Sequence, residues 1–155
     1  MSRIFAMVHK GCADDVKSAL LECAEDIDAQ DGDGRTPLIQ ASINNNEPVV
    51  RVLLEAGAQV NVSDAIGGTA LHYAAQASSL SIIKLLVANN AEVDAQDIHG
   101  NTPLWKAVFN SRGDHRSVGF LLSVGADRNK KNKNGKTPFD LASSIANFDI
   151  KSAFE

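Results

Sequence analysis

The chain has 155 residues, enough for one domain with a hydrophobic core. Hydrophobic residues make up 44% of it and charged residues 22%, which excludes a disordered chain, and no stretch approaches the apolar length of a membrane span. The net charge of −4 is unevenly spread, because residues 1–77 carry 5 basic and 11 acidic side chains whereas residues 78–155 carry 10 and 8. Such an asymmetry can orient a charged partner, and a surface that only keeps the protein soluble is an equally good explanation.

Residues 1–30 are predicted to form a helical unit without a regular motif. Five apolar residues there can occupy core positions, namely Ile4, Val16, Leu20, Leu21 and Ile27. The apolar stretch at the start is too short for the core of a signal peptide. Two cysteines suggest no disulfide framework, so a reducing cytoplasm is the expected location.

A motif with the pattern Asp-x-x-Gly-x-Thr begins three units in the rest of the chain, and a fourth unit begins with Asn in place of Asp. The motif threonines, 33, 33 and 35 residues apart, are Thr36, Thr69, Thr102 and Thr137. The units run over residues 31–63, 64–96 and 97–131, and residues 132–155 form a shorter final unit. Self-similarity at a fixed period of this length indicates stacked repeats.

Each motif residue suits a turn or a helix start. The glycines permit the positive φ of a tight turn, and the threonine hydroxyls can cap a helix. Proline follows three of the four threonines and fits the first helical turn. A later pair of large apolar residues, such as Leu53 and Leu54, predicts a second helix facing the core. Gly57, Asn90 and Gly125 are then expected to end that helix in left-handed geometry.

In these motifs the chain resembles the ankyrin-repeat family, whose unit of about 33 residues has two helices and a β-turn finger. The resemblance covers essentially the whole chain, residues 1–155, as a single domain. It implies an all-α solenoid of three full repeats between N- and C-terminal capping repeats, stacked because no unit buries its apolar faces alone. It also implies that His72 bridges backbone groups of neighbouring units. The final unit is expected to place four residues in a short amphipathic cap, Ile145, Phe148, Ile150 and Phe154.

The sequence offers little for catalysis, a metal or a cofactor. His72 has no base or nucleophile partner at motif spacing. Cys12, Cys23 and His9 lack a fourth metal ligand, and both cysteines are expected to be buried as small apolar side chains. No phosphate-binding loop or catalytic signature occurs. We therefore predict no catalytic residue, metal or cofactor.

Charged runs and one insertion are further candidates for binding. The acidic run over residues 22–33 lacks the spacing of a calcium loop, so a solvated edge is the simpler explanation and a surface for a basic partner the alternative. The basic run over residues 128–136 lacks interleaved aromatics, which favours a solvated finger or an acidic protein partner over nucleic acid. Two extra residues near Arg112 predict a longer exposed turn, which can serve recognition.

The family resemblance implies a concave partner-binding face formed by the fingers and the first helix of each unit. The predicted finger contacts are Asp33, Arg35, Ala65, Ile66, Ile98, His99, Asn101, Lys133 and Lys136. The predicted helix and turn contacts are Ile43, Asn44, Tyr73, Gln76, Trp105, Phe109, Asn110 and Arg112, with packing as the alternative role of Trp105. Ile66, Ile98 and Phe109 are apolar where the repeat does not require it, as is typical of an interface centre.

These features predict a non-enzymatic protein-binding module that is monomeric when free and binds neither membrane nor nucleic acid. The third unit, with its lengthened turn, is similar to compact bacterial ankyrin proteins encoded beside secreted toxins. That resemblance implies an immunity protein that blocks a toxin or another enzyme. A scaffold or regulatory subunit is the alternative. An enzyme built on His72 and His99 is a third interpretation, which substitution of either histidine by alanine would test.

Overall fold

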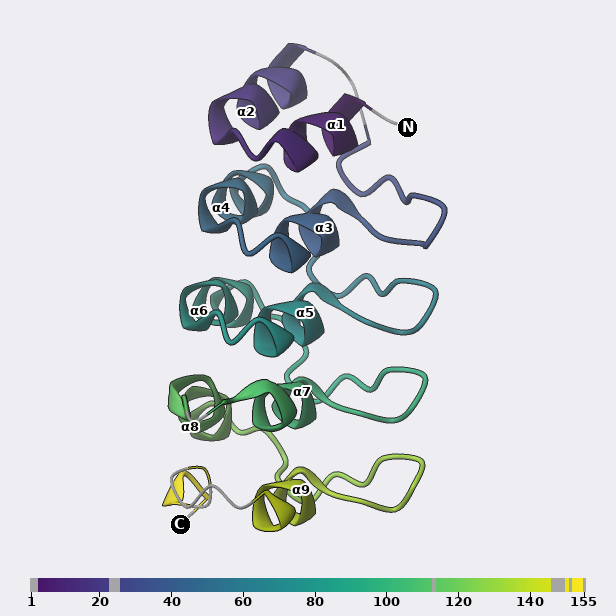
Figure 1. Cartoon of the computed structure of the whole chain (residues 1–155). Helices are drawn as coiled ribbons and strands as arrows, with labels where there is room; N and C mark the ends of the chain where they lie inside the picture. Colours follow the sequence, from purple (N-terminus) through teal and green to yellow (C-terminus); the bar gives the residue numbers. More distant parts are fainter. Residues whose placement is uncertain (1–2, 23–25, 113, 146–149, 151, 155) are drawn as a thin grey trace.

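The computed structural model describes residues 3–22, 26–112, 114–145, 150 and 152–154. Within these ranges the chain is helical, with one isolated β-bridge between Ser63 and Thr69 and no longer strand. The helices are α1 (Arg3–Lys10), α2 (Ala13–Glu22), α3 (Pro37–Ile43), α4 (Glu47–Glu55), α5 (Ala70–Gln76), α6 (Leu80–Ala88), α7 (Pro103–Asn110), α8 (Arg116–Ser123) and α9 (Pro138–Ser144). Helical pairs stack one above another in chain order (Figure 1), which confirms the predicted all-α solenoid.

The helices form two layers. An inner layer contains α1, α3, α5, α7 and α9, and an outer layer contains α2, α4, α6 and α8, with successive helices of each layer in contact. The fingers, residues 31–35, 64–68, 97–101 and 132–136, project on the side of the inner layer (Figure 1). The predicted unit boundaries at residues 31, 64, 97 and 132 all fall between helices.

The core recurs from unit to unit. Leu38, Leu71 and Leu104 of the inner layer are buried, and so are the outer-layer residues Leu53 and Leu86 at their equivalent positions. Small alanines are buried at the same place in four inner helices, Ala41, Ala74, Ala107 and Ala142. A methyl side chain lets neighbouring helices pack closely, so each unit buries part of its apolar surface against the next one.

Helix starts and turns follow the motif. The hydroxyls of Thr36, Thr102 and Thr137 each accept the N–H three residues on, at 3.0–3.2 Å. The finger glycines have φ between 71° and 76°, the left-handed region that glycine enters without a steric penalty. Gly57, Asn90 and Gly125 also have positive φ at the ends of the outer helices. The predicted roles of these residues are confirmed.

Two sets of hydrogen bonds join neighbouring units. Along the fingers, a backbone N–H of each donates to a carbonyl of the preceding one, in the pairs Ala65 to Asp33, Ile98 to Ile66 and Lys133 to His99, all at 2.9 Å. Between the outer helices and the fingers, a side-chain oxygen accepts an N–H of the next unit at 2.8–2.9 Å, in the pairs Asp28 with Gln59, Asn61 with Glu92 and Asp94 with Asp127. These recurring bonds fix the spacing of the units.

Two predictions for the N-terminal unit are wrong. Leu21 is 80% exposed, because α2 buries Val16 and Ala19, and a residue two positions after Ala19 points to the opposite side of the helix. Cys12 is exposed rather than buried, since it lies in the turn between α1 and α2. Cys23 lies outside the described residues.

The C-terminal cap is confirmed where the structure describes it. Ile150 and Phe154 are buried and Ile145 is half-buried, whereas Phe148 lies outside the described residues. The Phe154 ring packs edge-on against Phe139, with 5.8 Å between the ring centroids.

None of the described helices has the length and apolar character needed to cross a membrane.

Candidate protein-binding surface

Exposed apolar side chains mark the surface formed by the fingers and the inner helices, which we call the inner surface. Phe109, at the end of α7, is 67% exposed, and the finger residues Ile66 and Ile98 are 48% and 45% exposed. Ile43 and Gln76 occupy the positions equivalent to Phe109 on α3 and α5, so these three residues form a row across the inner layer. In this row the exposed Phe109 lies next to the polar Gln76, and Ile43 is half-buried, so apolar and polar groups alternate as at many interfaces.

The finger tips form a continuous edge. Ile66 and Ile98 lie in adjacent fingers, joined by the 2.9 Å bond from the Ile98 N–H to the Ile66 carbonyl. Ala65 and His99 beside them are exposed as well. The charge changes along this edge, because the first finger carries the exposed Asp33 and the last finger the exposed pair Lys133 and Lys136.

Tyr73 contributes to the fold as well as to the inner surface. Its hydroxyl donates a hydrogen bond to the Asp64 carboxylate, whose other oxygen accepts the N–H groups of Ile66 and Gly68 at 3.0 and 2.8 Å. Burial and the Asp64 bond raise the pKa of Tyr73 to about 12. The ring is half-buried, so only part of this side chain is open to a partner.

The next unit uses an ion pair in the same place. Lys106 follows Asp97 by nine residues, as Tyr73 follows Asp64, and its ammonium lies 3.0 Å from the Asp97 carboxylate. Arg35 pairs with Asp33 in the first finger, at 3.2 Å. The Asp97–Lys106 pair holds a finger to an inner helix, whereas the Arg35–Asp33 pair lies within one finger, and the charges of both pairs are only partly available for binding.

His72 has the bridging role that the resemblance implied. Its Nδ1 accepts the Thr69 N–H at 3.2 Å, which leaves the proton on Nε2, and Nε2 donates to the Asn101 carbonyl of the next unit at 3.0 Å. Burial lowers the pKa of His72, so the ring is neutral at neutral pH. Both ring nitrogens are therefore committed to the fold.

Several other predicted contacts also have structural partners. The Asn101 side-chain oxygen accepts a bond from Asn132 at 2.9 Å, and that of Asn44 accepts one from Gln40 at the same distance. Trp105 lies one turn before Phe109 on α7 and is half-buried. Contact with a partner stays a prediction for all of these residues, and their internal bonds make them parts of a rigid surface.

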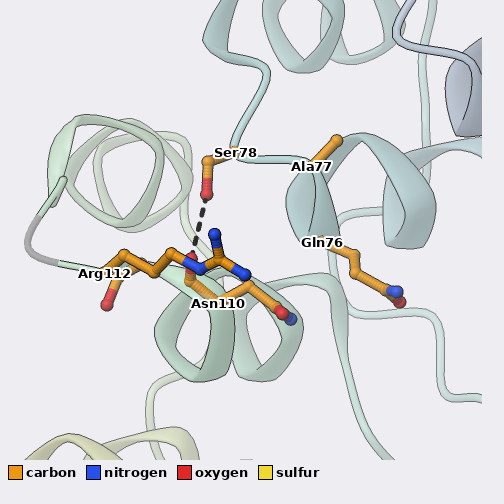
Figure 2. Close-up of a pocket in the computed structure, with 6 residues that line it drawn as sticks. Gln76, Ala77, Ser78, Asn110 and Arg112 are labelled. Carbon is orange, nitrogen blue, oxygen red and sulfur yellow. Dashed lines mark hydrogen bonds between the residues drawn. The ribbon is translucent and has the colours of Figure 1, made fainter.

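A polar recess, which the sequence did not predict, separates the tips of two helical hairpins. It has a volume of about 340 Å³ and is lined by Gln76, Ala77, Ser78, Asn110, Ser111 and Arg112 (Figure 2). The predicted longer turn is confirmed, because residues 111–115 separate α7 from α8 whereas only three residues separate α3 from α4 and α5 from α6. Arg112 is exposed and Ser111 is buried.

The acidic run is used in turns rather than gathered into a site. The Asp31 carboxylate accepts the N–H groups of Asp33 and Arg35 at 2.9 Å, and that of Asp28 accepts the Gln59 N–H. Across the described part of the chain, no three His, Cys, Asp or Glu side chains lie together in a way that could hold a metal ion.

Comparison with protein families agrees with this architecture. A model of ankyrin repeats in three copies matches residues 4–97, and a model of ankyrin repeats in many copies matches residues 73–122. No curated protein matches the sequence.

Proposed function

The chain belongs to the ankyrin-repeat family, a family of protein-interaction modules, and from this premise we propose that its inner surface binds and blocks a toxin or another enzyme. The module itself is proposed to be non-enzymatic and to act in the cytoplasm as a monomer until it meets its partner. The partner then lies against the fingers and the exposed ends of the inner helices.

The exposure of Phe109, Ile66 and Ile98 is the observation that carries this proposal. These are three of the five large apolar side chains that stand out as exposed among the described residues, and all three occupy fingers or an inner helix. Apolar side chains that are withdrawn from water only in a complex supply much of the binding free energy at interface centres. The polar and charged finger residues around them suit an interface rim.

The rigidity of the surface supports an inhibitor in particular. The finger ladder, the His72 bridge and the Asp97–Lys106 ion pair order the inner surface before a partner arrives. A preordered surface loses less conformational entropy on binding, which favours a tight complex. The similarity of the third unit to bacterial proteins encoded beside toxins supports a toxin as the enzyme that is blocked.

The experiment compares charged substitutions at exposed apolar positions of the inner surface with one at an exposed apolar position of the outer layer. The partner is captured from native lysate, and its affinity is measured by calorimetry for the parent chain, for Ile66→Asp combined with Phe109→Asp, and for Leu21→Asp. Leu21 is the control, because it is more exposed than either inner-surface residue and lies on α2 of the outer layer. The double variant is expected to bind at least about 100-fold more weakly, and the control to bind as the parent does.

An unchanged affinity of the double variant would reject the inner surface as the binding site. The inhibitor proposal has its own readout, the enzymatic activity of the captured partner. We expect one equivalent of the chain to abolish that activity. A stable complex with full activity would instead identify a scaffold or regulatory subunit.

A further inference from the structure

The recess between the hairpin tips brings an arginine together with amide and hydroxyl groups. Figure 2 shows Arg112 and Asn110 on one side of it, with Ser78, Ala77 and Gln76 on the other. The Ser78 hydroxyl donates to the Asn110 carbonyl at 3.4 Å and ties the two turns together. The walls of the recess therefore belong to two neighbouring units.

Arg112 has no counter-ion among the residues that the structure describes. No ion pair or hydrogen bond joins its guanidinium to any residue in the described ranges, and the side chain is exposed. The nearby acid Asp114 is already engaged, because it binds Arg116 at 2.8 Å, and this bond lowers the pKa of Asp114 to about 2. Gln76 is also exposed, and its amide forms no hydrogen bond with another described residue.

The backbone at Arg112 is unusual for its residue type. Three turns between inner and outer helices contain a residue with positive φ. That residue is Asn45 (φ of 53°) in one turn and Ser78 (φ of 54°) in the next, and it is Arg112 (φ of 43°) in the lengthened turn. Asparagine enters this left-handed region comparatively often, but a long side chain such as arginine does so rarely. The two-residue insertion in the third unit thus presents a cation where the other units present a short polar group. An uncommon conformation that persists in a folded protein is reason to look for a function.

These groups fit a carboxylate. A guanidinium offers paired N–H donors that match the two carboxylate oxygens, whereas the Gln76 amide is a separate donor on the opposite side of the recess. The carbonyl ends of α5 and α7 meet at the recess, and their negative partial charge weakens the attraction of any anion, so binding of a carboxylate depends on the Arg112 guanidinium. Arg112 is the one basic residue among the described residues that line the recess, which is too little positive charge for a run of backbone phosphates, so a protein carboxylate is favoured over a nucleic acid.

The recess also adjoins the row formed by Ile43, Gln76 and Phe109. Gln76 lines the recess and is the α5 equivalent of Phe109, which directly precedes Asn110 on α7. A ligand that places a carboxylate beside Arg112 therefore brings its neighbouring residues towards Phe109. We propose that the recess receives an Asp or Glu side chain of the partner protein, next to an apolar residue that covers Phe109. This rests on the proposed function in requiring a protein partner, although the subsite can be tested without one.

The test uses two blocked tripeptides that differ in one charge, acetyl-Leu-Glu-Leu-amide and acetyl-Leu-Gln-Leu-amide. Each is titrated into the isotope-labelled full chain at constant ionic strength, and amide chemical shifts are followed by NMR. The glutamate peptide is expected to shift the amides of Ser78, Asn110 and Arg112 and to bind at least about fivefold more tightly than the glutamine peptide. Arg112→Gln is expected to remove this preference, and Lys131→Gln, at an exposed position of the basic run that is not a predicted contact, to leave it intact.

Three results would overturn the proposal: equal affinity for the two peptides, shifts confined to residues 128–136, or a charge preference that survives Arg112→Gln. If Arg112→Gln disturbs the amide spectrum away from the recess, Arg112→Lys is used in its place. Arg112→Lys is expected to reduce the preference for the glutamate peptide, because lysine lacks the paired donors of arginine. If the titrations fail but the Ile66→Asp and Phe109→Asp double variant still loses partner binding, only the carboxylate subsite is rejected. If the titrations succeed but the double variant binds the partner as the parent does, the proposed inner-surface function is rejected and the subsite stands.

Discussion

Substitution of Gly100 by alanine tests how closely the fingers pack. A Cβ at Gly100 would lie 2.8 Å from the backbone nitrogen of Lys133 and 3.0 Å from the Cα of Asn132. Both atoms belong to the backbone of the next finger, so no side-chain rotation can relieve the contact. The finger has to move, and its bond from the Lys133 N–H to the His99 carbonyl has to weaken.

The expected loss of stability has two parts. Gly100 has φ of 76°, and alanine in this region costs about 1–2 kcal/mol. Displacement of a well-packed neighbour costs about 1–3 kcal/mol more, which brings the total to about 2–5 kcal/mol. Gly57 and Gly135 have φ of 89° and 71°, and a Cβ added at either would meet no atom within 4 Å, so Gly57→Ala and Gly135→Ala should lose only the first part.

Urea denaturation followed by circular dichroism measures the free energy of unfolding of these variants. Gly57→Ala is the better control, because Gly57 belongs to an internal repeat, as Gly100 does, whereas Gly135 belongs to the last finger. Equal losses for Gly100→Ala and Gly57→Ala would refute the argument that neighbouring fingers touch at this glycine.

Two further predictions concern the core and the His72 bridge. Leu86→Ala, which empties a fully buried position of α6, is expected to lower the free energy of unfolding by about 2–5 kcal/mol in the same urea assay, and a loss below about 1 kcal/mol would contradict its core role. Burial lowers the pKa of folded His72 below the ordinary 6.5, so its contribution to stability is present above that pH and is lost as the pH falls towards the folded pKa. His72→Gln keeps an amide at the helix start but does not titrate, so its unfolding free energy should fall less than that of the parent between about pH 7 and pH 5. Parallel pH profiles for the parent and His72→Gln would contradict this prediction.

The parts of the fold that follow from local chemistry could be predicted from the sequence. A glycine at φ near 75° and a threonine hydroxyl at a helix start depend on neighbours only a few residues away, and the period of the repeat places them in space. In the N-terminal unit, residues 1–30, no motif fixes the helical register. The predicted burial of Leu21 and Cys12 is therefore wrong, and the structure exposes both side chains.

Features that depend on the geometry of side chains distant in the sequence were harder to predict. The bond from Tyr73 to Asp64 and the bond from Asn132 to Asn101 each commit a predicted contact residue to the fold, and the spacing alone does not reveal either bond. The recess arises where the lengthened turn of the third unit meets Ser78 of the second. The extra residues near Arg112 were the only sequence signal for it.

Hydrogen exchange of the complex tests most directly whether the inner surface is the site of binding. Amide exchange is compared by mass spectrometry for the free chain and for the chain bound to its captured partner. If the partner binds there, added protection is expected over residues 64–68 and 97–101 and at the exposed ends of α5 and α7, with the outer helices α2, α4 and α6 unchanged. Added protection on the outer helices with unchanged fingers would contradict binding at the inner surface.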